Sequence, residues 1–221
     1  MIEDYAKAIF NKLGYKVMRN HPGFRVEWTP DVPQAISVLD LLVRLELSRN
    51  ADFNLIQIGA NDGIMADPIH HMIKRYSLKG MLIEPIPDIF ERLKANYAFA
   101  ANRLQFLNIA ITTGEGEGDI PFFVFSSPDQ AWRQELSRLS STSRSKLEHI
   151  KASRRIEEKI TEIAVRYESV GMFIKKRMIE SISLLVTDLE GFDISIVTEF
   201  WAMGSTPGSS MWKFWNNPTR R

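Results

Sequence analysis

The sequence predicts an α/β fold in which a parallel β-sheet is covered by helices on both faces. Three short apolar runs carry this prediction: residues 53–58 (FNLIQI), 81–83 (MLI) and 103–111 (RLQFLNIAI). Segments with helical spacing separate these runs, and such alternation of strands with helices is typical of a parallel sheet. A fourth apolar run, Ile182–Thr187, ends in acidic residues and precedes the helical pattern of FDISIVTEFW.

Two helices are expected between the first three strands. The segment IMADPIHHMIKRYSL contains Asp67 and Pro68, which suit the first turn of a helix. The segment PDIFERLKANY starts at Pro87 and repeats apolar side chains at helical spacing. The expected inward-facing residues of this second helix are Ile89, Phe90, Leu93 and Tyr97.

Three regions follow from a coarse division of the chain. Residues 1–51 are expected to form a helical extension, with one helix over Ile2–Leu13, a loop over Asn20–Pro33 and a second helix containing Ile36, Leu39, Leu42 and Leu45. Residues 52–200 form the main domain. Residues 201–221 show no period, so an irregular tail is expected there.

The middle of the chain is less regular. Asp119–Phe125 is expected to be a strand, and Trp132–Arg155 reads as a polar helix. Residues 133–159 contain eight Lys or Arg against four Glu, so this stretch is locally basic. Such a run could steer an anionic acceptor, but a solvated helix face with i,i+4 ion pairs is the favoured interpretation.

The composition is that of a soluble globular protein. Of the 221 residues, 44% are hydrophobic and 25% are charged, the net charge is +1, and there is no cysteine. Nearly balanced charge gives no reason to expect nucleic acid or a membrane as a partner, and without cysteine there is no disulfide, thiol catalysis or Cys-ligated metal. Glu3 and Asp4 stand where a signal peptide would be basic, so a cytoplasmic location is the default expectation.

The first strand leads into a glycine turn, GANDG at residues 59–63, which matches neither G-x-G-x-x-G nor a P-loop. Gly59 allows a bend with positive φ, and Gly63 allows close approach of a helix or a ligand. Glu84 ends the second strand 25 positions after Gly59, where an acidic residue typically binds both ribose hydroxyls. Because this turn disfavours a pyrophosphate, a nucleoside without a phosphate chain is indicated, which suggests S-adenosyl-L-methionine. The alternative is that both glycines only form a tight strand–helix turn.

Four segments together resemble the FkbM family of S-adenosylmethionine-dependent methyltransferases. They are FNLIQIGANDGIMADPIHHMI, GMLIEPIPDIFERLKANY, LQFLNIAI and SLLVTDLEGFDISIV, in the family's order and spacing from about Asp52 to Val197. The resemblance implies a class I methyltransferase fold, which is Rossmann-like. It also implies methylation of a hydroxyl oxygen of a sugar, glycan or natural product.

The resemblance further implies which residues bind the methyl donor. The glycine turn would lie against the methionine part of S-adenosyl-L-methionine, Glu84 would hold the ribose hydroxyls, and two residues after the third strand would lie near adenine. The expected donor-binding residues are Gln57, Gly59, Asn61, Asp62, Gly63, Glu84, Asn108, Ala110, Asp188 and Glu190. Gln57 departs from the acidic residue common in this class, but its amide can still form a hydrogen bond with the donor.

Two residues are candidates for the base that removes the proton of the acceptor. His149 resembles a histidine that the family often shows in this region, and the pKa of histidine suits proton transfer near neutrality. An exposed histidine on a polar helix is an equally weighted interpretation, and Asp188 is the next candidate. Asp188 and Glu190 could bind a hard cation together with another carboxylate, but no third ligand is evident in the sequence, so no metal site is expected. His70 and His71 are expected to be surface and packing residues of a helix.

Two other functions remain open from the sequence. A non-catalytic module that binds a nucleoside or another molecule would show binding without turnover. An enzyme acting on sugars with a nucleotide cofactor would instead prefer a nucleotide.

The end of the sequence is the second departure from the family. The pattern is lost after Phe200, so we expect the C-terminal strands of the fold to be missing. Leu184, Leu185 and Val186 would then belong to an edge strand, which invites self-association. Weak or no activity as an isolated monomer is the corresponding expectation.

Overall fold

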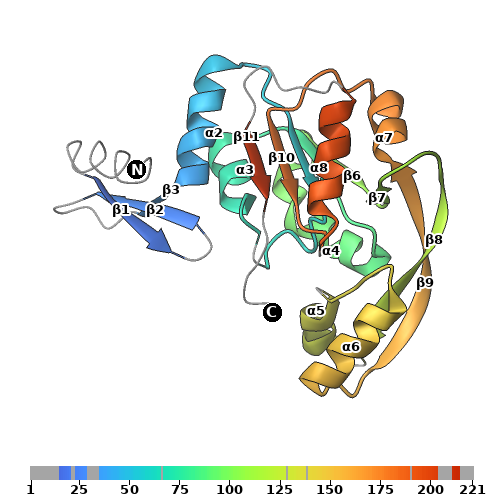
Figure 1. The fold of residues 1–221 in the computed structure, drawn as a ribbon. Helices are drawn as coiled ribbons and strands as arrows, with labels where there is room; N and C mark the ends of the chain where they lie inside the picture. Colours follow the sequence, from blue (N-terminus) through green and yellow to red (C-terminus); the bar gives the residue numbers. More distant parts are fainter. Residues whose placement is uncertain are drawn as a thin grey trace. The chain divides into compact units, whose positions relative to one another are not determined.

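The computed structural model describes residues 15–20, 23–28, 35–65, 67–127, 129–137, 139–189, 191–203 and 211–214 (Figure 1). The chain divides into two compact units, one that reaches to Phe53 and one that spans Asn54–Phe214. Each unit is described by itself.

The first unit contains an antiparallel sheet of three strands and one helix. Strands β1 (Tyr15–Asn20), β2 (Gly23–Trp28) and β3 (Ala35–Ser37) pair in the order β1-β2-β3, and α2 (Val38–Arg49) packs on β2 and β3. The expected second helix is confirmed, but the expectation of a purely helical extension with a loop at residues 20–33 is wrong. GFRVEW alternates large apolar and charged side chains, a period of two that fits a strand. The expected helix at Ile2–Leu13 lies outside the described residues.

The second unit is built on a parallel sheet of five strands. They are β4 (Leu55–Ile58), β5 (Gly80–Ile83), β6 (Leu104–Leu107), β10 (Leu184–Thr187) and β11 (Met211–Phe214), in the spatial order β11-β10-β4-β5-β6. All four neighbouring pairs are parallel. Every residue of β4 and β10 is buried, which explains why both are continuous apolar runs with little alternation.

Helices cover both faces of this sheet, as predicted. On one face lie α3 (His70–Tyr76) and α4 (Pro87–Asn96), followed by the short 3-10 helix η1 (Ala98–Ala100). On the other face, α7 (Val170–Arg177) and α8 (Asp193–Ala202) share a core with β4, β5 and β10. In that core the rings of Phe173 and Phe200 meet edge to face, with 6.0 Å between their centroids.

A second sheet projects from this domain. It contains β7 (Ala110–Thr112), β8 (Glu117–Ser126) and β9 (Lys159–Ser169) in the order β7-β9-β8. β8 and β9 pair antiparallel along ten residue pairs, from Glu117↔Glu168 to Ser126↔Lys159. We call this pair the ribbon. The expected third strand, residues 103–111, is therefore divided between β6 in the main sheet and β7 in the second one.

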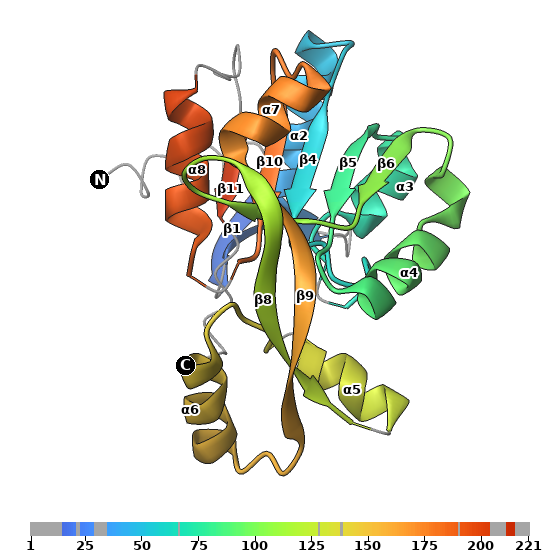
Figure 2. The same ribbon diagram turned by 90° about the vertical axis from the view of Figure 1, so that its right-hand side faces the viewer.

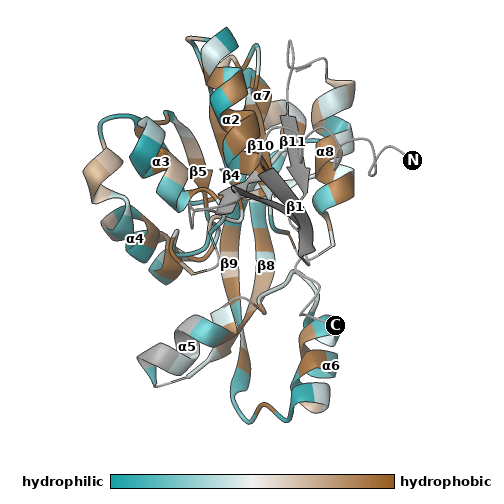
Figure 3. Cartoon of the chain, turned by 90° about the vertical axis from the view of Figure 1, so that its left-hand side faces the viewer, coloured by the Kyte–Doolittle hydropathy of each residue, from teal (hydrophilic) through white to brown (hydrophobic). Residues whose placement is uncertain are grey.

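Two helices lie between the ribbon strands, α5 (Gln130–Ser137) and α6 (Arg144–Arg154). Figure 2 shows both at the far end of the ribbon, on the side to which the strands of the main sheet point. We call residues 127–158 the lobe. Its buried apolar side chains form a small core with Phe125 at the end of β8; they are Leu136, Leu139, Leu147 and Ile156. In Figure 3 strands β5 and β10 are mostly hydrophobic, whereas teal and brown alternate along α6. The continuous helix expected over Trp132–Arg155 is interrupted, because Ser141 pairs with Phe123 of β8.

The C-terminal prediction is wrong in one respect. β10 lies between β4 and β11, so its backbone groups are paired on both sides and it is not an edge strand. The expected irregular tail accordingly contains one strand, Met211–Phe214, in register with Leu184–Thr187. Numbered by their order along the chain, the five strands lie in the spatial order 3-2-1-4-5, so the strand after β10 is present.

Candidate functional site

Four strands of the main sheet end side by side, and backbone hydrogen bonds hold their ends together. The amides of Gly59 and Ala60 both donate to Ile83 O at 3.0 Å, which joins the end of β4 to that of β5. Asp188 N donates to Ile58 O at 3.0 Å, and Glu84 N donates to a carbonyl at the end of β6 at 3.1 Å. In open α/β sheets this carboxyl edge is where ligands bind, at the point where strand order reverses.

The two glycines of the turn are required for different structural reasons. Gly59 has φ +78°, and a Cβ there would lie 2.5 Å from Asp188 O. Gly63 has φ +74°, and a Cβ there would lie 2.3 Å from a ring carbon of Tyr97. Gly59 therefore lets β4 and β10 approach each other at the edge, whereas Gly63 lets the turn pack on α4 and its following residue.

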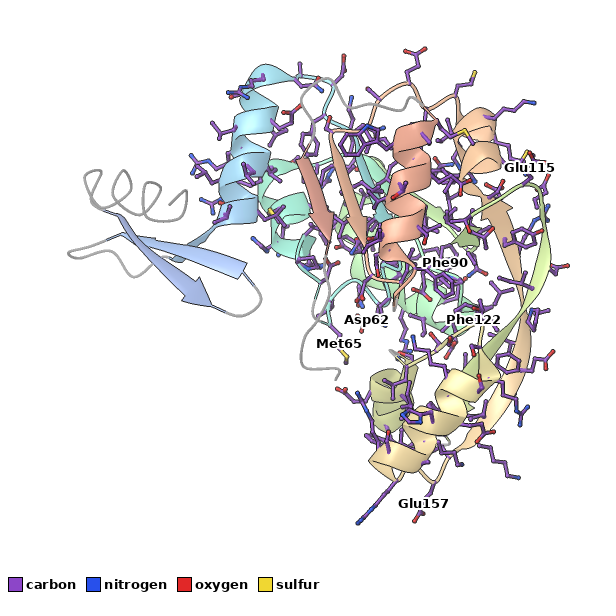
Figure 4. The ribbon with its side chains drawn as sticks, viewed as in Figure 1. Asp62, Met65, Phe90, Glu115, Phe122 and Glu157 are labelled. Carbon is purple, nitrogen blue, oxygen red and sulfur yellow. The ribbon has the colours of Figure 1, made fainter. Side chains whose placement is uncertain are left out.

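Polar side chains fold the rest of the turn. Asn61 has a left-handed backbone with φ +51°, which asparagine tolerates better than most residues. Asp62 is buried, and its Oδ1 accepts hydrogen bonds from the amides of Ile64 at 3.0 Å and Met65 at 2.8 Å. Figure 4 shows Asp62 and Met65 beneath the sheet, on the side of the lobe.

Glu84 connects the second strand to the glycine turn. Its Oε2 accepts a hydrogen bond from Asn61 N at 2.9 Å, and its Oε1 accepts one from Ile86 N at 3.0 Å. Burial raises the pKa of Glu84 to about 7, against the effect of these two amides, and the charges of Asp88 and Asp188 raise it further. The side chain is only 4% exposed, so this carboxyl group changes its charge near neutral pH at the ligand edge.

Asn108 and Ala110, expected near adenine, take different places. Asn108 Nδ2 donates to Glu84 O at 2.9 Å and to Pro85 O at 3.0 Å, so it fixes the loop that carries the Glu84 side chain. Ala110 is buried in β7 and pairs with Tyr167 of β9. The structure therefore assigns Asn108 to the edge and Ala110 to the start of the second sheet.

Gln57 is the buried polar residue of β4. Its Nε2 donates to Asp67 Oδ1 at 3.4 Å, and its Oε1 is buried without a hydrogen-bond partner among the described residues. A buried amide oxygen left in this way is costly. A ligand with an N–H or O–H group would satisfy it.

The two candidate bases lie in different parts of the domain. Asp188 is half-buried and follows β10 directly, in contact with the glycine turn through its backbone. His149 is exposed on α6, in the lobe. Glu190 lies outside the described residues.

Sequence reasoning missed the polar residues beneath the turn. Tyr97 Oη donates to Asp67 Oδ2 at 2.7 Å, and burial raises the pKa of both groups above their ordinary values. His70, expected only as a packing or surface residue, places Nδ1 2.7 Å from Gly63 O, and its ring lies 4.9 Å from that of Tyr97. His71 is exposed. The signal in the sequence was weak, because Asp67 reads as an ordinary first-turn residue and Tyr97 as an ordinary core residue.

The described part of the chain contains neither a candidate metal site nor a candidate membrane span. Among its side chains, no group of three or more His, Asp or Glu could hold a metal ion. None of the described helices has the length and apolar character that a membrane span requires.

Comparison with known families agrees with this geometry. The model of the methyltransferase FkbM domain matches residues 57–214, which include the glycine turn, Glu84, Asp188 and β11. The chain therefore belongs to the FkbM methyltransferase family, and the predicted family is confirmed. Neither curated proteins nor solved structures yielded a match to the chain. The family implies a methyl donor.

Proposed function

We propose that this methyltransferase transfers the methyl group of S-adenosyl-L-methionine to a hydroxyl oxygen of a sugar, glycan or natural product. One observation carries the proposal: the glycine turn, the Glu84 carboxyl group and Asp188 meet at the carboxyl edge of one parallel sheet. The acceptor is a small molecule or glycan. Neither nucleic acid nor a membrane is part of the proposal.

The side chains present suit such a donor. Each Glu84 oxygen accepts one amide hydrogen bond and has a second lone pair, so two ribose hydroxyls could each donate to one oxygen. Gln57 Oε1 has no hydrogen-bond partner among the residues that the structure describes, which suits a cationic ammonium such as the methionine part carries. Gly59 leaves the turn without a side chain where the strands are closest.

The remaining tasks of the protein are positioning and proton removal. When bound, S-adenosyl-L-methionine would supply a methyl group on a sulfonium sulfur, which the acceptor oxygen takes in line as the carbon–sulfur bond breaks and neutral S-adenosylhomocysteine leaves. Because the leaving group needs no protonation, the residues have to hold both reactants in line and accept one proton from the hydroxyl. The position of Asp188 beside the turn supports it as proton acceptor over His149, which is exposed on α6.

The first test is isothermal titration of S-adenosylhomocysteine into the wild-type protein and Glu84→Ala. Hydrogen bonds to a carboxylate are charge-assisted, so we expect the variant to lose about 2 kcal/mol of binding free energy. Glu91→Ala is the matched control, because Glu91 is exposed on α4 and pairs only with Lys94 among the contacts that we describe, at 2.8 Å.

Three outcomes would change the proposal. Equal affinity of a folded Glu84→Ala would remove the ribose assignment. Tight binding by the wild type, with no methyl transfer to any of a broad panel of hydroxyl acceptors, would favour a binding module. Preference for a nucleotide over S-adenosylhomocysteine would favour the nucleotide-dependent alternative.

A further inference from the structure

A buried polar cluster lies directly beneath the glycine turn, on the face of the sheet covered by α3 and α4. We propose that Asp67 and Tyr97 are positioning residues of the donor site, whose hydrogen bond holds both the turn and Gln57 in the geometry that binds the donor. The proposal deepens the function proposed above and rests on it. Neither residue is expected to touch the donor.

The Asp67 carboxylate is the centre of this cluster. Its Oδ2 accepts from Tyr97 Oη at 2.7 Å, and its Oδ1 accepts from Ile69 N at 2.8 Å and from Gln57 Nε2 at 3.4 Å. All three contacts require an acceptor, which suits the ionised carboxylate. Asp67 therefore links β4, the start of α3 and the end of α4 at one point.

Tyr97 and the preceding residue, Asn96, connect this cluster to the glycine turn. The Tyr97 ring is fully buried against Gly63, where even a Cβ would collide with it. Asn96 Nδ2 donates to Asp62 O at 2.8 Å, and His70 reaches Gly63 O from the next helix. Two consecutive carbonyls of the turn are thus held from below, while Glu84 holds the Asn61 amide from the sheet.

Asp67 also decides which way the Gln57 amide faces. Because the carboxylate only accepts hydrogen bonds, it selects the rotamer in which Nε2 points toward it. The same choice leaves Oε1 buried and without a protein partner among the described residues. If Asp67 were replaced by asparagine, the amide could turn over and present a donor in place of that acceptor.

Tyr97→Phe is the sharpest variant, since it keeps the ring against Gly63 and removes only the hydroxyl that holds Asp67. We expect affinity for S-adenosylhomocysteine to fall about tenfold, measured by titration at a temperature where the variant is fully folded. Asp67→Asn should lose at least as much. A purely stabilising hydrogen bond would lower Tm and leave this affinity unchanged, so the two roles are separable.

Tyr167→Phe is the matched control, because it removes a tyrosine hydroxyl from β9, outside the turn and its supporting helices. We expect its affinity to equal that of the wild type. Affinity of folded Tyr97→Phe and Asp67→Asn within about twofold of the wild type overturns the proposal.

Amide hydrogen exchange of the ligand-free protein tests the inference independently of the donor. The amides of Asn61, Ile64 and Met65 are hydrogen-bonded within the turn, so Tyr97→Phe should speed their exchange several-fold without affecting the ribbon. If the wild type does not bind S-adenosylhomocysteine, the proposed function fails and exchange alone decides on the support of the turn. Unchanged exchange in the turn then overturns the proposal.

Discussion

The glycine turn and the lobe both lie on the side to which the strands of the main sheet point (Figure 2), and they are held in different ways. In the turn, individual atoms have individual partners. Glu84 accepts a hydrogen bond from the Asn61 amide, and the carbonyl oxygen of Asp188 lies so close to Gly59 that a Cβ there would collide with it. In the lobe, four buried apolar side chains make a small separate core with Phe125 of β8, and most of the surface of α6 is exposed. A single added methyl group therefore matters in the turn, whereas the lobe surface can change while its core is kept.

The base of the ribbon is joined to α7 by ion pairs of a buried carboxylate. Glu168 at the end of β9 is buried and pairs with Arg177 at 2.6 Å and Lys176 at 3.1 Å, both on α7. Burial works against the charge of Glu168, but these hydrogen bonds outweigh it and hold its pKa below the ordinary value. Figure 4 labels Glu115, just before β8 at the base of the ribbon, and Glu157, just before β9 at its far end. The lobe is thus carried on an anchored two-stranded support.

The largest effect is expected from Gly59→Ala. Its Cβ would meet Asp188 O at 2.5 Å, and the φ of +78° strains any residue with a side chain. We expect a lower Tm and at least about 100-fold weaker binding of S-adenosylhomocysteine, since the turn and β10 must move apart to relieve the contact.

Gly114→Ala separates the effect of the steric contact from that of the strained φ. Gly114 also has a positive φ, +89°, but a Cβ there would meet no atom within 4 Å. We expect a cost of about 1–2 kcal/mol in the free energy of unfolding and unchanged binding. Equal binding by the two variants would show that contact with β10 is not what makes the turn sensitive.

The second prediction compares the two candidate proton acceptors, Asp188 at the strand edge and His149 in the lobe. If the base belongs to the strand edge, Asp188→Asn should lower turnover about 100-fold on a confirmed acceptor at saturating donor. If it belongs to the lobe, His149→Ala should show that loss instead. Because Asp188 adjoins the turn and His149 is exposed on α6, we expect the larger loss from Asp188→Asn.

The elements that the sequence predicts well are those whose signal is local. β4, β5 and β10 are short buried strands, so each reads as an apolar run, and Glu84 follows from its place at the end of one of them. The strand order does not follow from these local signals, because β10 pairs with β4 although β7, β8, β9 and three helices lie between β6 and β10 along the chain.

The elements that it predicts poorly depend on distant partners. β11 is a four-residue segment whose assignment rests on pairing with β10, and no period within MWKF indicates it. β8 and β9 pair with each other although α5 and α6 separate them in the sequence, so the ribbon cannot be inferred from either strand alone. Tyr97 and Asp67 are 30 positions apart, and nothing in either local pattern shows that they share a hydrogen bond.

The smallest effect is expected from pH, and it again distinguishes the buried turn from the exposed lobe. The pKa of Glu84 is raised by burial from 4.5 to about 7, so the ligand-free fold holds a proton that the unfolded chain has lost in this window. The resulting stability is fully present below about pH 4.5 and is lost as pH rises through about 7, by at most about 3 kcal/mol.

Donor binding should change in the opposite direction, because the ionised Glu84 accepts from two ribose hydroxyls and the protonated form accepts less well. A pKa of about 7 makes the ionised fraction rise roughly tenfold between pH 6 and pH 8, so the affinity of the wild type for S-adenosylhomocysteine should rise by about that factor. Glu84→Gln should bind more weakly with a flat profile, and any titration of the ligand itself is common to both proteins. Titration calorimetry across this range, with His149→Ala as the control from the lobe, checks the prediction. A flat wild-type profile, or one that Glu84→Gln retains, would place the titrating group elsewhere than at the end of β5.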